Sequence, residues 1–97
     1  MKKLIILPTY NESKNIRKTI EIINSQGSDA DILIVDDNSP DGTAALVKDL
    51  DLKNIFIIER ESKQGLGSAY VNGFKWALDN SYSKIIQMDA DLSHDPI

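Results

Sequence analysis

The chain has 97 residues, of which 41% are hydrophobic, so it is long enough for one small domain with a core of its own. Its formal charge is 11 − 15 = −4, and no basic patch is interleaved with aromatic residues, which argues against nucleic acid as a partner. The absence of cysteine excludes disulfides, zinc–thiolate sites and thiol catalysis.

The start of the chain lacks the pattern of an export signal. Lys2 and Lys3 precede an apolar run of only four residues, 4–7, which Pro8 and Asn11 interrupt. No apolar stretch is long enough to span a bilayer. We therefore expect a cytoplasmic protein, and a membrane-bound substrate would bring it to the cytoplasmic face of a membrane.

Four short apolar runs alternate with amphipathic segments along the chain. The runs cover residues 4–7, 32–35, 55–58 and 85–88. Such continuous runs are typical of strands that are buried on both faces. The repeated alternation predicts right-handed βαβ units, and hence an α/β fold in which a parallel sheet of about four strands is flanked by helices.

Three helices are expected between these strands. The first carries isoleucines at helical spacing: Ile16, Ile20 and Ile23. Asn11 is its candidate N-cap, and Gly27 is expected to end it. Residues 46–50 predict a short second helix. The third has an apolar stripe made of Leu66, Ala69, Tyr70, Gly73, Phe74, Ala77 and Leu78. Trp76 falls outside this stripe, and we expect it to be partly exposed.

Two aspartates, Asp89 and Asp91, follow the last strand, and ligands bind beyond the carboxyl ends of strands in sheets of this kind. Their oxygens suit Mg²⁺ or Mn²⁺, which leave room for substrate phosphates and stabilise charge on a departing diphosphate. The alternative is an ordinary turn, in which one of these aspartates accepts hydrogen bonds from nearby backbone amides.

Asp36 and Asp37 end the second strand. A carboxylate there can accept hydrogen bonds from a nucleobase or a ribose, or it can cap the turn over residues 39–42. We expect one aspartate to be structural and the other to face a ligand. Tyr10, in the first loop, can pack beside a base, although an ordinary half-buried tyrosine fits the same pattern.

Two further features are weak signals. Gly65 and Gly67 form a lone Gly-x-Gly, which indicates either a phosphate-binding loop or the close packing of a helix. His94 is the only histidine and is not assigned as a base. No catalytic residue is assigned.

Four stretches together resemble the motifs of a known family. They are Pro8-Thr9-Tyr10-Asn11-Glu12, Val35-Asp36-Asp37-Asn38-Ser39-Pro40-Asp41-Gly42-Thr43, Gly65-Leu66-Gly67-Ser68-Ala69-Tyr70 and Met88-Asp89-Ala90-Asp91-Leu92-Ser93-His94. Their order and spacing, over residues 5–96, are similar to those of the dolichol- or polyprenol-phosphate mannosyltransferases. These belong to family 2 of the inverting glycosyltransferases, which have the GT-A fold.

The resemblance implies a role for each matching residue. The nucleoside of a nucleotide-sugar donor would be bound by Pro8, Tyr10, Glu12, Val35 and Asp37. Of the acidic pair, Asp37 would contact the base or ribose, whereas Asp36 would serve stability. Asp89 and Asp91 would form the metal-binding D-x-D motif for Mg²⁺ or Mn²⁺, with Ala90 contacting the donor through its backbone. The family transfers mannose from GDP-mannose to the phosphate of a polyprenol or dolichol at a membrane surface, with inversion.

The resemblance also implies an extent. In this family the chain continues well past the D-x-D motif, and Asp95-Pro96 has the pattern of a helix start. We therefore expect residues 1–97 to be the N-terminal, nucleotide-sugar-binding part of a glycosyltransferase domain, truncated after the motif and inactive in transfer by itself.

Two alternatives remain open at this point. One is another family 2 transferase, which would use UDP-glucose or a similar donor. The other is a receiver-type signalling module, which also gathers aspartates around Mg²⁺ at strand ends. In that module, however, the acidic pair follows the first strand and the phosphorylated aspartate follows the third.

Overall fold

The computed structural model describes residues 3–25, 30–61 and 66–88. The four strands and three helices expected from the sequence are all present. In chain order they are β1 (Lys3–Thr9), α1 (Ile16–Ser25), β2 (Asp31–Asp36), α2 (Thr43–Leu50), β3 (Ile55–Glu59), α3 (Leu66–Asp79) and β4 (Lys84–Gln87). Within these described ranges, no helix has both the length and the apolar character needed to cross a membrane.

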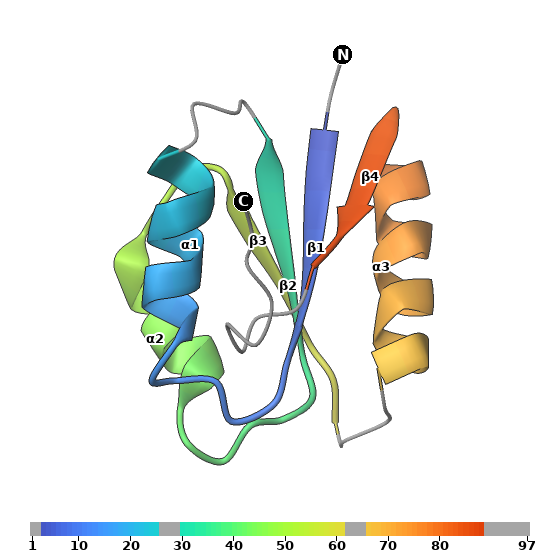
Figure 1. Ribbon diagram of the computed structural model, residues 1–97. Coiled ribbons are helices and arrows are strands. Elements are labelled where there is room, and N and C mark those ends of the chain that lie inside the picture. Colours follow the sequence, from blue (N-terminus) through green and yellow to red (C-terminus); the bar gives the residue numbers. More distant parts are fainter. Residues whose placement is uncertain (1–2, 26–29, 62–65, 89–97) are drawn as a thin grey trace.

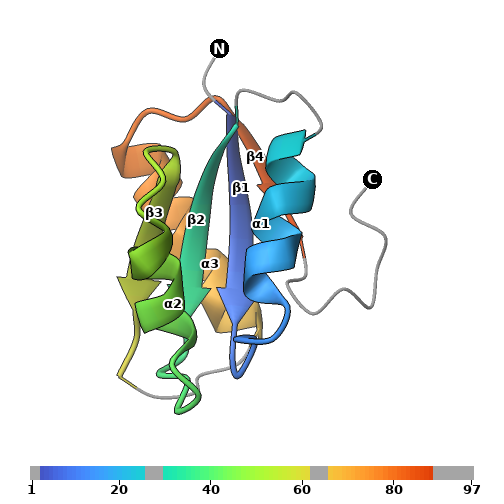
Figure 2. The ribbon, with the colours of Figure 1, turned by 90° about the vertical axis from the view of Figure 1, so that its left-hand side faces the viewer.

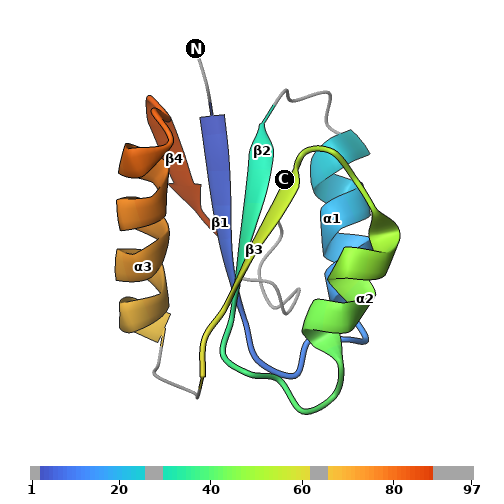
Figure 3. The ribbon, with the colours of Figure 1, turned by 180° about the vertical axis from the view of Figure 1, so that it is seen from behind.

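The strands form one parallel sheet in the order β3-β2-β1-β4 (Figure 2). Helices α1 and α2 cover one face of this sheet, and α3 covers the other (Figures 1 and 3). The chain therefore builds outward from β1 to β3, and then crosses the opposite face through α3 to add β4 on the far side of β1. The junction of β1 and β4 is the point where the strand order reverses, and such a point is where sheets of this type bind ligands.

The core consists of two layers, because successive side chains of a strand point to opposite faces. Ile5 and Leu7 pack with Ile32 and Ile34 on the side of α1 and α2. The intervening residues pack on the side of α3, namely Leu4, Ile6, Leu33 and Val35. Burial on both faces explains why β1 and β2 are continuous apolar runs rather than alternating ones.

Helix α1 does not begin as the sequence predicted. Asn11 has a left-handed backbone with φ of 56°, whereas an N-cap residue has an extended one. The turn before the helix is closed instead by the carbonyl of Glu12, which accepts the N–H groups of Asn15 at 3.0 Å and of Ile16 at 2.8 Å. The assignment of Asn11 as N-cap is therefore wrong. Gly27, expected to end the helix, lies outside the described residues.

Helix α3 packs closely on the sheet through small residues. Ala69, Gly73 and Ala77 are buried. A Cβ atom on Gly73 would lie 2.8 Å from both Cδ1 and Cγ2 of Ile6, so only glycine permits this approach. Leu78, expected on the apolar stripe, is 71% exposed, and that part of the prediction is wrong.

An aromatic cluster closes the outer part of this layer. Trp76 is half-buried, as expected, with its ring centroid 5.2 Å from that of Phe56 and 5.7 Å from that of Tyr82. The hydroxyl of Tyr82 donates to Asp31 at 2.5 Å. Burial, followed by this hydrogen bond and the charge of Asp31, raises the pKa of Tyr82 to about 12. The contact joins the segment before β4 to the start of β2.

Candidate nucleotide-binding site

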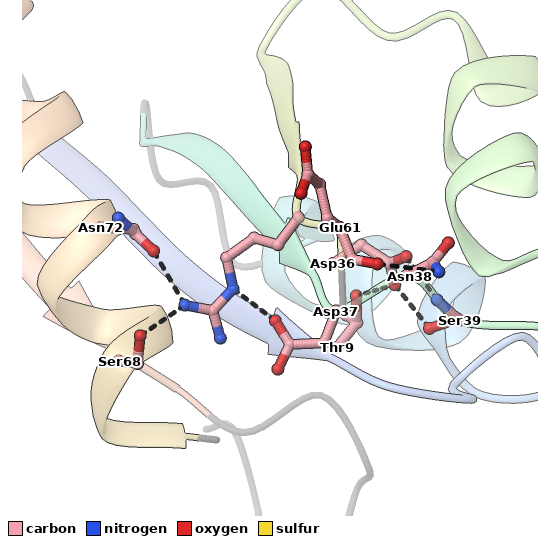
Figure 4. A network of polar contacts seen from close by, with 9 residues as sticks. Thr9, Asp36, Asp37, Asn38, Ser39, Glu61, Ser68 and Asn72 are labelled. Carbon is pink, nitrogen blue, oxygen red and sulfur yellow. Dashed lines mark hydrogen bonds and ion pairs between the residues drawn. The ribbon is translucent and has the colours of Figure 1, made fainter. Parts of the chain in front are cut away.

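The acidic pair at the end of β2 is buried and divided between two tasks. Asp36 is 1% exposed. It accepts the hydroxyl of Thr9 at 2.6 Å and both the hydroxyl and the N–H of Ser39, at 2.6 and 2.9 Å (Figure 4). Asp36 thus ties the end of β1 to the turn that begins at Ser39, which confirms that one aspartate of the pair is structural.

Asp37 forms a buried ion pair that the sequence did not indicate. The Nε of Arg60 donates to its carboxylate at 2.5 Å, and the two side chains are only 4% and 7% exposed. The Nη1 of Arg60 also donates to Ser68 and Asn72 on α3, at 2.8 Å each. Figure 4 shows Ser68 and Asn72 on one side of Asp37, and Asp36 with Ser39 on the other. Arg60, Asp36 and Asp37 together carry one positive and two negative formal charges, a sum of +1 − 2 = −1.

The loop after β1 is fastened to the loop after β2 by its backbone. Three successive N–H groups of the first loop donate to side chains of the second loop or of the first residue of α2: Asn11 to Ser39 at 2.9 Å, Glu12 to Thr43 at 3.0 Å, and Ser13 to Asp41 at 3.1 Å. The partners are 28 to 31 residues apart in the chain. These bonds hold the two loops together as one unit at the carboxyl edge of the sheet.

Asp41 also starts helix α2. Gly42, at the N-cap position, has no side chain for capping, and Asp41 instead accepts the N–H of Thr43 at 3.1 Å and its hydroxyl at 2.5 Å. Burial alone would raise the pKa of Asp41, but the hydrogen bonds from Thr43 and Ser13 outweigh it and lower that pKa below its ordinary value. The Ser-Pro-Asp-Gly-Thr stretch is therefore a brace between loops.

The residues expected to bind the nucleoside lie around this brace. Tyr10 and Glu12 are half-buried in the first loop. The N–H of Asp37 donates to the carbonyl of Thr9 at 3.0 Å, so Asp37 and the loop that follows Thr9 share one edge, as expected. Val35 is fully buried in the α3-side layer. The binding roles themselves stay predictions, and Asp89, Ala90, Asp91 and His94 lie outside the described residues.

Pro8 stands where a proline costs no hydrogen bond. The carbonyl of Ile6 accepts the N–H of Met88 at 3.1 Å, and the register of β1 with β4 ends at Ile6 and Gln87. Since backbone groups of a strand alternate in direction, Pro8 faces the same side as Ile6, past the end of this ladder. The proline therefore removes no hydrogen bond from the described part of this ladder.

The acidic pair does not fit a metal ion. Among the residues that the structure describes, no three His, Cys, Asp or Glu side chains gather as a metal site would require. Asp36 and Asp37 accept from hydroxyl, amide and guanidinium donors, whereas a divalent cation needs carboxylate oxygens that face it together. Close helix packing does not explain Gly67, because a Cβ there would meet nothing within 4 Å, and Gly65 lies outside the described residues.

A parallel sheet in the order 3-2-1-4, with polar residues at the carboxyl ends of its strands, is the arrangement of a Rossmann-type nucleotide-binding protein. Receiver modules have the order 2-1-3-4-5, which would place β3 rather than β4 beside β1, so that alternative is wrong. The chain belongs to glycosyl transferase family 2, whose sequence model matches residues 4–97.

Two curated relatives match nearly the whole chain. Polyprenol monophosphomannose synthase of Mycolicibacterium smegmatis is 45% identical over 96 residues, which are 96% of this chain and 36% of the relative. Undecaprenyl-phosphate mannosyltransferase of Micrococcus luteus is 40% identical over 98 aligned residues, covering 99% of this chain and 40% of the relative. The chain thus spans about two fifths of the length of the curated relatives it matches.

Solved structures have the same fold. TarS 1-349 of S. aureus in complex with UDP superposes with a TM-score of 0.82 at 27% identity, over 94% of this chain and 28% of that one. The mannosyltransferase PcManGT of Pyrobaculum calidifontis, in complex with GDP-Man and Mn²⁺, has a TM-score of 0.78 at 23% identity, over 93% and 27%. The expected GT-A fold is confirmed.

Proposed function

We propose that the chain binds the nucleotide-sugar donor of a polyprenol-phosphate mannosyltransferase. The donor is GDP-mannose, the acceptor is the phosphate of a polyprenol or dolichol at a membrane surface, and a divalent cation, Mg²⁺ or Mn²⁺, takes part. The single observation that carries this proposal is identity of 40–45% with two enzymes named for polyprenyl-phosphate mannose transfer, across essentially the full chain.

The geometry of the carboxyl edge supports a nucleoside site there. The buried carboxylate of Asp37 lies beside the end of β1, where the half-buried Tyr10 follows. A fixed carboxylate can accept N–H groups of a base or hydroxyls of a ribose, and an aromatic ring can pack on the base. We assign these tasks to Asp37 and Tyr10, with Pro8 and Glu12 beside them and the fully buried Val35 supporting them from the core.

The first loop supports the use of a metal. In many Rossmann-type sites, free backbone N–H groups after the first strand receive the diphosphate. Here the N–H groups of residues 11–13 already donate to the second loop. The guanidinium of Arg60 is paired with Asp37, and the chain as a whole is acidic. These described groups are already engaged, and we assign the positive charge for a diphosphate to a cation held by Asp89 and Asp91.

The proposed reaction is a single displacement with inversion. An oxygen of the acceptor phosphate attacks C1 of mannose, the bond from C1 to the diphosphate oxygen breaks, and GDP leaves with the electron pair. A bound divalent cation would stabilise the negative charge that develops on the departing diphosphate. A phosphate acceptor is already anionic, so the displacement needs little help from a general base.

A titration tests the donor. GDP, GDP-mannose, UDP and UDP-glucose are each titrated into the purified protein in the presence of Mn²⁺, and binding is measured by calorimetry. We expect GDP and GDP-mannose to bind at least about tenfold more tightly than the uridine nucleotides, which corresponds to about 1.4 kcal/mol. Binding of all four ligands should weaken with EDTA if the cation bridges protein and diphosphate, because the diphosphate is common to them.

A UDP-sugar donor is the second candidate. The likeness to TarS in complex with UDP favours it, because that structure superposes well at 27% identity. Tighter binding of UDP than of GDP in the same titration would replace the mannosyltransferase proposal with this one. Binding of neither nucleotide would contradict both.

A further inference from the structure

We propose that Arg60 is a positioning residue for the nucleoside: it fixes the carboxylate of Asp37 in place and anchors it to helix α3. The inference rests on the proposed function, because it assigns Asp37 to the base or ribose. Neither the motifs of the sequence nor the comparisons single out Arg60. What carries it is the set of contacts that its side chain makes between two elements that are far apart in the chain.

Arg60 is held at both its ends. Its backbone N–H donates to the carbonyl of Asp36 at 2.8 Å, so the main chain after β3 is fixed beside the end of β2. Its Nη1 donates to Ser68 and Asn72, one helical turn apart on α3, while Nε donates to Asp37. A planar guanidinium that is bonded on two nitrogens cannot rotate, so the carboxylate oxygen that Nε holds has a fixed position.

A buried ion pair of this kind is poorly explained by stability alone. The loss of hydration on burying two charges offsets most of their attraction, and an apolar pair of the same volume is often at least as stable. Both side chains are less than a tenth exposed, and they lie at the ligand-binding edge rather than in the centre of the core. An ionised carboxylate with a fixed direction is what recognition of N–H or O–H donors requires.

The arrangement also couples α3 to the site. Ser68 and Asn72 are both half-buried on this helix, and Asn72 is next to Gly73, which rests on Ile6 of β1. The position of the guanidinium is therefore set by how closely α3 sits on the sheet. Asp37 takes its orientation from an element that need not itself touch the nucleotide.

The test separates the nucleoside from the phosphates. The intact protein and its variants are titrated by calorimetry with Mn²⁺ and either the nucleoside diphosphate that the wild type binds, or inorganic pyrophosphate. Arg60→Lys keeps the charge but cannot hold all three acceptors, and it should weaken nucleoside diphosphate binding about tenfold, the loss of one charge-assisted hydrogen bond. Pyrophosphate affinity should stay within about twofold of wild type, a difference of less than 0.5 kcal/mol.

Arg17→Lys is the matched control, since Arg17 pairs with Glu21 on the surface of α1 with both side chains more than 60% exposed. It should change neither affinity. Ser68→Ala removes one anchor and leaves the ion pair, so it remains informative if the Arg60 variant folds poorly. It should weaken nucleoside diphosphate binding about threefold and spare pyrophosphate.

A double-mutant cycle completes the test. If Arg60 acts through Asp37, Arg60→Lys should add no further loss of affinity in an Asp37→Asn background. Additive losses, equal losses for nucleoside diphosphate and pyrophosphate, or wild-type affinity in Arg60→Lys would each overturn the positioning role while leaving the proposed function intact. A wild-type protein that binds no nucleoside diphosphate would overturn the proposed function, and this role with it.

Discussion

The contact between Gly73 and Ile6 gives the most direct test of how α3 is placed. Gly73→Ala would put a Cβ atom 2.8 Å from two carbons of Ile6 and 3.2 Å from a third. Carbon atoms in contact normally lie about 3.5–4.0 Å apart, so the overlap approaches 1 Å. Ile6 is fully buried and cannot turn aside. The helix must therefore move away from β1, or the strand must bend.

The size of the effect follows from two opposed terms. Overpacking a well-packed core costs about 1–3 kcal/mol. Alanine favours a helix over glycine by about 1 kcal/mol, which offsets part of that cost. With two contacts at 2.8 Å, the upper half of the overpacking range applies, about 2–3 kcal/mol, so the free energy of unfolding should fall by about 1–2 kcal/mol. Because Asn72 precedes Gly73 and bonds to Arg60, nucleotide affinity should fall in the same variant.

Chemical denaturation measures the loss, and Gly67→Ala is the control. Gly67 is on the same helix, is exposed, and would place its Cβ in open space. The free energy of unfolding of that variant should rise by up to about 1 kcal/mol, because alanine favours a helix more than glycine does. Ile6→Val combined with Gly73→Ala should destabilise less than the sum of the two, because the shorter side chain removes one clash. A Gly73→Ala protein as stable as wild type would refute the reasoning.

Four further changes test other contacts. Asp36→Ala leaves three donors without their acceptor, one buried and two partly buried, and denaturation should show a loss of about 2–3 kcal/mol. Tyr82→Phe should cost about 1 kcal/mol near neutral pH. The stabilisation by Tyr82 is complete below its unfolded pKa of 10.0 and is lost as the pH rises through its folded pKa of about 12. The wild type should therefore lose stability over this alkaline range, and Tyr82→Phe should not. The pKa of Asp41 is lower in the folded protein than its unfolded value of 3.8, so ionised Asp41 adds to the stability above that value. This contribution is lost as the pH falls through the folded pKa. The Asp41→Asn variant should therefore lose less stability than wild type when the pH is lowered. Asp91→Ala should abolish metal-dependent transfer by the intact protein, with its circular dichroism spectrum unchanged.

Each of these four can fail separately. Wild-type stability in Asp36→Ala would show that its hydrogen bonds add nothing over hydration. An alkaline step that persists in Tyr82→Phe belongs to another group, and an unchanged acid transition in Asp41→Asn would remove Asp41 from the pH dependence. Full activity of Asp91→Ala, or undiminished activity of wild type in EDTA, would contradict the role of the D-x-D motif.

The fold could be predicted from the sequence because its signals are local and repeated. A continuous apolar run can be buried on both faces only in a covered sheet, and the alternation with helices leaves a parallel arrangement as the simple solution. The predictions were wrong where tertiary contacts, rather than the local sequence, decide how a residue is used. The stripe that included Leu78 shows which way a helix faces, but not how far the covering surface extends along it.

The sequence predicted at which edge of the sheet the candidate residues lie, but not the contacts that their side chains make. The positions of Asp37 and Tyr10 after their strands followed from strand ends alone. The pairing of Asp37 with Arg60 did not, since it depends on side-chain directions in elements 23 residues apart. Asn11 shows the same limit: its backbone serves a hydrogen bond to Ser39, and that distant demand replaced the helix cap its residue type indicated.

A second set of hydrogen bonds lies at the opposite edge of the sheet, away from the candidate site. Tyr82 with Asp31, and Asn54 with Asn24 and the carbonyl of Ala30, join neighbouring segments at the amino ends of the strands. These contacts lie a full strand length from the polar network at the carboxyl ends. Substitutions there can raise or lower stability without disturbing the two loops to which we assign the donor. The proposed donor specificity and the thermal stability can therefore change independently, in evolution or by design.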